Sequence, residues 1–61
     1  MNSIERTVFV MTDTDIVEAI HRLKEVYDNR INMYGWSKKD ARAFIRSIEK
    51  EFIRRNLNEF I

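Results

Sequence analysis

The pattern of apolar and polar residues divides the chain into one short apolar run and two amphipathic stretches. The run covers residues 6–12 and reads Arg-Thr-Val-Phe-Val-Met-Thr. Its β-branched and aromatic residues favour extended backbone, and no strong helix former interrupts them. The pattern therefore predicts a single N-terminal β-strand, preceded by a lead-in at residues 1–5.

This predicted strand has no partner elsewhere in the chain. A lone strand leaves a row of backbone N–H and C=O groups without hydrogen bonds, which is not stable in water. Either it pairs with the same strand of a second copy, or it adds to the sheet of another protein. The residues expected in the dimer contact are Thr7, Val8, Phe9, Val10 and Met11.

The first amphipathic stretch predicts a helix over residues 14–33. Apolar residues recur there at helical spacing, at Ile16, Ile20, Leu23, Tyr27, Ile31 and Tyr34. Thr12, Thr14 and Asp15 are alternative N-caps, and Asp15 with Glu18 has capping-box spacing. Gly35, the only glycine, follows the stretch and suits a left-handed helix end.

The second amphipathic stretch predicts a helix that opens at Ser37 and ends near Arg55. Ser37 and Asp40 have the spacing of a capping box, and Trp36 is placed to pack against Ala41. The apolar positions of this helix are Ala41, Phe44, Ile45, Ile48 and Phe52, with Ile53 at the edge. The tail at residues 56–61 either continues this helix or docks on the core.

Together these elements predict an α+β, mainly helical fold: one strand and a two-helix hairpin in a single domain, 1–61. A chain of 61 residues without cysteine has a small core and no disulfide to support it. The apolar face of the first helix spans about 200°, about twice what one neighbouring helix covers, so either the strand or a second subunit covers the remainder. Both features favour a homodimer formed through the strand.

The net charge of +1 hides an asymmetry between the two halves of the chain. Residues 1–36 hold four Lys/Arg and six Asp/Glu, whereas residues 37–61 hold seven and four. The basic residues of the second helix are Lys38, Lys39, Arg42, Arg46, Lys50 and Arg54, which form a face about 160° wide opposite the apolar one. This face is either an ordinary solvated surface or a docking face for phosphates or an acidic protein.

The sequence offers little for catalysis. His21, the only histidine, is followed by Glu25 and Asp28, and a weak surface pair with Glu25 is the expected role. One histidine and no cysteine do not make a zinc site, and no glycine-rich loop is present to bind a phosphate. We expect no enzyme activity, cofactor, metal or small-molecule substrate. Neither a membrane span nor a signal peptide is recognisable, so the expected location is cytoplasmic.

The order of strand, helix, short glycine-containing turn and helix resembles the ribbon-helix-helix family of DNA-binding proteins. The matching segments are residues 6–12 as the ribbon and residues 35–40 as the turn that opens the second helix. The resemblance implies a dimer whose paired strands enter the DNA major groove. It also implies base contacts from ribbon residues such as Arg6 and Thr7, and a phosphate held near Ser37, Lys38 and Lys39.

Two functional hypotheses follow. The first is a dimeric DNA-binding transcription regulator of the ribbon-helix-helix kind. The second is a small inhibitor or adaptor, of the kind that phages and mobile elements encode, which binds a larger protein. It would use the basic second helix, addition of its strand to a sheet, or both.

Overall fold

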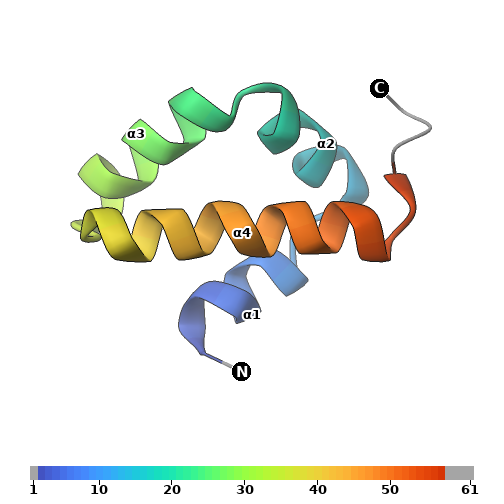
Figure 1. Cartoon of the computed structure of the whole chain (residues 1–61), viewed down its shortest axis with the longest axis horizontal. Helices are drawn as coiled ribbons and strands as arrows, with labels where there is room; N and C mark the ends of the chain where they lie inside the picture. Colours follow the sequence, from blue (N-terminus) through green and yellow to red (C-terminus); the bar gives the residue numbers. More distant parts are fainter. Residues whose placement is uncertain (1, 58–61) are drawn as a thin grey trace.

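The computed structural model describes residues 2–57, which form four helices and no β-strand (Figure 1). Helix α4, Lys38–Arg54, runs through the middle of the molecule. In the view of Figure 1, helices α2, Asp13–His21, and α3, Leu23–Tyr34, lie above α4, and α1, Ser3–Phe9, lies below it. The described part of the chain is therefore mainly helical, as predicted, but the prediction of a strand followed by a two-helix hairpin is wrong.

The predicted strand at residues 6–12 is replaced by α1 and the connection to α2. Asn2 caps α1 by accepting a hydrogen bond from the Glu5 amide at 2.8 Å, and the Thr7 hydroxyl donates to the Ser3 carbonyl at 2.8 Å. Val8 is only 1% exposed. A helix satisfies its backbone groups internally, so it removes the need for a partner strand, and burial of Val8 outweighs the local β propensity.

The single helix predicted over residues 14–33 is two helices. Thr12 is the N-cap of α2: its hydroxyl accepts from the Asp15 amide, and the Asp15 carboxylate accepts from the Thr12 amide. At Arg22 the backbone turns to φ −126° and ψ 38°, and its N–H is shared between the carbonyls of Glu18 and Ala19. Because neither glycine nor proline stands there, the sequence gives no sign of this break.

The turn into α4 agrees with the sequence prediction. Gly35 ends α3 in the left-handed conformation, with φ 63°. The Ser37 hydroxyl accepts a hydrogen bond from the Asp40 amide at 3.2 Å, and α4 ends at Arg54 with Arg55 as its C-cap. In the predicted tail, Asn56 is left-handed and Leu57 is buried, whereas residues 58–61 lie outside the described residues.

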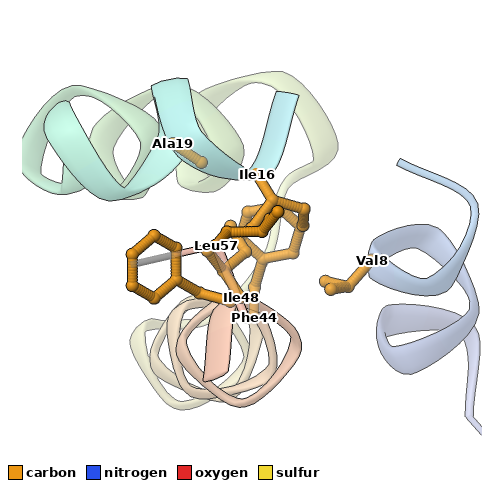
Figure 2. Close-up of a cluster of buried hydrophobic side chains, with 7 residues drawn as sticks. Val8, Ile16, Ala19, Phe44, Ile48 and Leu57 are labelled. Atoms are coloured by element: carbon orange, nitrogen blue, oxygen red, sulfur yellow. The ribbon is translucent and has the colours of Figure 1, made fainter. Parts of the chain in front are cut away.

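The core lies between α4 and α2 and is closed from the side by α1 (Figure 2). It consists of Val8, Ile16, Ala19, Phe44, Ile48, Phe52 and Leu57. Val8 points from α1 toward this cluster, and Leu57 packs on it from beyond the end of α4. Helix α3 has no fully buried residue; its Val26, like Trp36 in the turn, packs against the cluster while half-buried. The face of α4 that points away from α1, α2 and α3 is open to solvent.

Candidate functional site

The open face of α4 carries all six basic residues that the sequence assigned to the second helix. Lys38, Lys39, Arg42, Arg46, Lys50 and Arg54 are all exposed. The other side of the same helix buries Ala41, Phe44, Ile48 and Phe52 in or beside the core. Because the apolar side of α4 is buried against the core, the side that carries the cations faces solvent. We refer to these six residues as the basic face.

Most cations of the basic face have no ionic partner within residues 2–57. The exception is Arg54, whose Nε lies 2.7 Å from Glu51 Oε1 and whose second terminal nitrogen donates to Oε2 at 3.0 Å. The hydrogen bond from Arg54 lowers the pKa of Glu51 despite partial desolvation, and Arg55 adds to this effect. The other five cations, Lys38, Lys39, Arg42, Arg46 and Lys50, form no ion pair with any described residue.

An exposed isoleucine lies within the basic face. The sequence placed Ile53 at the edge of the apolar positions, but the residue is 75% exposed. It follows Lys50 by three positions and Arg46 by seven, so the three residues share one side of the helix. Isolated exposed apolar residues are common, but one that adjoins Lys50 and Arg46 gives this face both charge and a hydrophobic contact point.

Arg55 is a structurally important residue that the sequence did not single out. Its two terminal nitrogens donate to the carbonyls of Met11, at 2.7 Å, and Phe9, at 2.9 Å. The same guanidinium bonds Glu51 at 2.7 Å and Asp13 at 3.1 Å. Arg55 therefore joins the end of α1 to α4. No local pattern reveals this role, because three of its partners are more than 40 positions away.

The predicted DNA-reading ribbon does not form in the described residues. Arg6 is exposed on α1, but the Thr7 hydroxyl is used within the helix and Val8 is buried. Residues 7–11 therefore cannot form the predicted dimerisation strand in this fold. The prediction of a homodimer was based on this unpaired strand, so it loses that basis. Ser37, which was expected near a bound phosphate, is the N-cap of α4.

The remaining sequence candidates form no chemical centre in the part of the chain that is described. His21 is exposed at the end of α2, and no three histidine, cysteine or acidic side chains among residues 2–57 are placed to hold a metal ion. Over the same residues, no helix is both long and apolar enough to cross a bilayer.

No protein-family model matches this chain, and neither does any curated protein or solved structure.

Proposed function

We propose that this chain is a small non-catalytic binding protein, of the inhibitor or adaptor kind, that docks the basic face of α4 on an acidic surface of a larger protein. The observation that carries this proposal is the combination of five exposed cations without ion pairs in the described chain and the 75% exposed Ile53 among them. The cations attract an acidic partner, and Ile53 supplies an apolar contact at the centre of the interface.

The spacing of the cations supports a docking role. Lys38, Arg42, Arg46 and Lys50 follow one another at four-residue intervals, which places successive charges about 6 Å apart along α4. Like charges at this spacing destabilise a helix, so the row has a cost in the free protein. An acidic partner offsets that cost by neutralising the row.

A protein partner fits this surface better than DNA does. A domain that binds DNA through phosphates is usually strongly basic, whereas this chain has a net charge of only +1. Ile53 is exposed and gains little from contact with a sugar-phosphate backbone. The ribbon that would have read base edges is helix α1 instead.

The proposal is tested by capture of partners from a cell lysate with and without nuclease treatment. The informative variant is Arg46→Glu with Lys50→Glu. The matched control is Arg6→Glu with Lys24→Glu, which changes the net charge equally at exposed positions on α1 and α3. We expect a nuclease-resistant protein partner that the control retains and the α4 variant loses. The interaction should weaken as salt is raised.

Two results would contradict the proposal. If both double variants retained the partner equally, the basic face would be a solvated surface without a binding role. If capture disappeared after nuclease treatment, and purified duplex DNA bound in a manner that required Arg46 and Lys50, the partner would be nucleic acid.

A further inference from the structure

A groove of about 300 Å³ runs beside the basic face, between α1 and α4. It is lined by Glu5, Val8 and Phe9 from α1 and by Ser47, Lys50 and Glu51 from α4. Lys50 belongs both to this groove and to the basic face, so the two surfaces are continuous. The volume is at the lower end of that of ligand pockets, and it suits one large side chain better than an extended ligand.

The α1 wall of the groove presents an exposed aromatic ring on a fixed backbone. Phe9 is 54% exposed as a residue, whereas its neighbour Val8 is buried and anchors the helix. Arg55 holds the carbonyl of Phe9 at 2.9 Å and that of Met11 at 2.7 Å. An aromatic residue that is held in place before binding loses little entropy when a partner covers it, which is the property of an interface anchor.

On its α4 side, the groove favours a partner with carboxylates. Glu51 is already neutralised by Arg54 and Arg55, which both bond its carboxylate oxygens at 2.7 Å. Lys50 is left as a cation at the rim, and Glu5 is a carboxylate on the α1 side. An acidic segment that enters from the α4 side meets Lys50 and Arg46 before it reaches Phe9.

We propose that this groove is the specificity pocket of the docking surface and that it receives an aromatic side chain from an acidic segment of the partner protein. The partner's ring packs against Phe9, in the offset or edge-to-face arrangement that aromatic pairs prefer. Carboxylates that flank the ring pair with Lys50 and Arg46. This proposal rests on the proposed function, because it identifies the chemical character of the partner that binds beside the basic face.

The test uses two defined polymers in place of the unidentified partner: poly-L-glutamate and a random copolymer of glutamate and tyrosine. Their affinities for the fluorescently labelled chain are measured by anisotropy at about 0.15 M salt. We expect the wild type to bind the copolymer about tenfold more tightly than poly-glutamate. Phe9→Ala should remove this preference while leaving the affinity for poly-glutamate unchanged.

Val10→Ala is the matched control. Val10 is 71% exposed at the end of the same helix but lines a different groove, with Asn2, Ser3, Arg6 and Thr7. This variant should keep the preference for the copolymer. Ser47→Gln fills the groove from the α4 side without altering α1, so this variant should lose the preference for the copolymer. That result would locate the aromatic contact in the groove independently of Phe9.

The outcomes separate the two proposals. If Phe9→Ala keeps the preference, or if Val10→Ala loses it to the same extent, the groove is not the specificity pocket, and the docking role of α4 is unaffected. If Arg46→Glu with Lys50→Glu binds poly-glutamate as tightly as the wild type does, or if neither polymer binds the wild type, the proposed function fails and the groove proposal fails with it.

Discussion

Replacing Arg55 with methionine tests whether this side chain holds α1 in place. Methionine keeps most of the length of the side chain and packs well in partly buried positions, but it donates no hydrogen bond. The substitution removes the donors to the carbonyls of Phe9 and Met11 and the ion pairs with Asp13 and Glu51. Glu51 keeps its hydrogen bonds from Arg54.

The structure sets the expected magnitude. The Arg55 side chain is only 14% exposed, so its two short bonds to backbone carbonyls are poorly replaced by water. The ion pair with Asp13 adds little stability, because the Asp13 side chain is 68% exposed. Together we expect a loss of about 2–4 kcal/mol in the free energy of unfolding. A domain of this length has about 3–9 kcal/mol in total, so the effect is large.

The assay is urea and thermal unfolding followed by far-UV circular dichroism. Arg55→Met should lower the melting temperature by about 10 °C or more. Arg54→Met is the matched control: it removes the same charge and another donor to Glu51, but from a side chain that is 61% exposed. That variant should unfold almost as the wild type does. Equal destabilisation by the two substitutions, or none from Arg55→Met, would refute the role assigned to Arg55.

Two further substitutions test other parts of the fold. Gly35→Ala should destabilise the chain by about 1 kcal/mol in urea unfolding, because φ 63° is costly for a residue with a Cβ while the space around it is empty. Gly35→Asn should cost less, and equal stability of Gly35→Ala and wild type would contradict the backbone argument. The hydrogen bond from Arg54, with that from Arg55, lowers the pKa of Glu51 from its ordinary value of 4.5. The ionised Glu51 carboxylate therefore contributes its full stabilisation above pH 4.5, and this stabilisation is lost as the pH falls through the lowered pKa. The difference in unfolding free energy between wild type and Glu51→Gln should therefore stay constant from about pH 7 to 5 and shrink below that; a difference that did not change with pH would contradict the assignment.

The sequence predicted those features whose causes are local. Gly35 has the conformational freedom that its helix end requires, and Ser37 caps the first turn of a helix whose apolar and basic residues lie on opposite sides. The basic face was therefore found from spacing alone. Ile53 was expected at the edge of the apolar face but is exposed. Periodicity does not show how much of the edge of an apolar face a neighbouring helix covers.

The N-terminal region was mispredicted because its structure depends on distant residues. The run of Thr7, Val8, Phe9 and Val10 favours a strand by local propensity. What makes it helical is the burial of Val8 in the core and the bonds from Arg55 to the end of α1. The break at Arg22 was missed for a similar reason, since it carries no glycine or proline and both flanking segments keep a helical pattern.

The most direct test of the docking surface is an NMR titration of the ¹⁵N-labelled chain with the glutamate–tyrosine copolymer. If the copolymer binds at the basic face and the adjacent groove, the largest amide shift changes should fall on Arg46, Lys50 and Ile53 of α4 and on Phe9 of α1. Amides on the outer side of α3, such as those of Lys24 and Asp28, should change little. Shift changes centred on α2 and α3, or spread evenly over the chain, would contradict the conclusion that α4 is the docking surface.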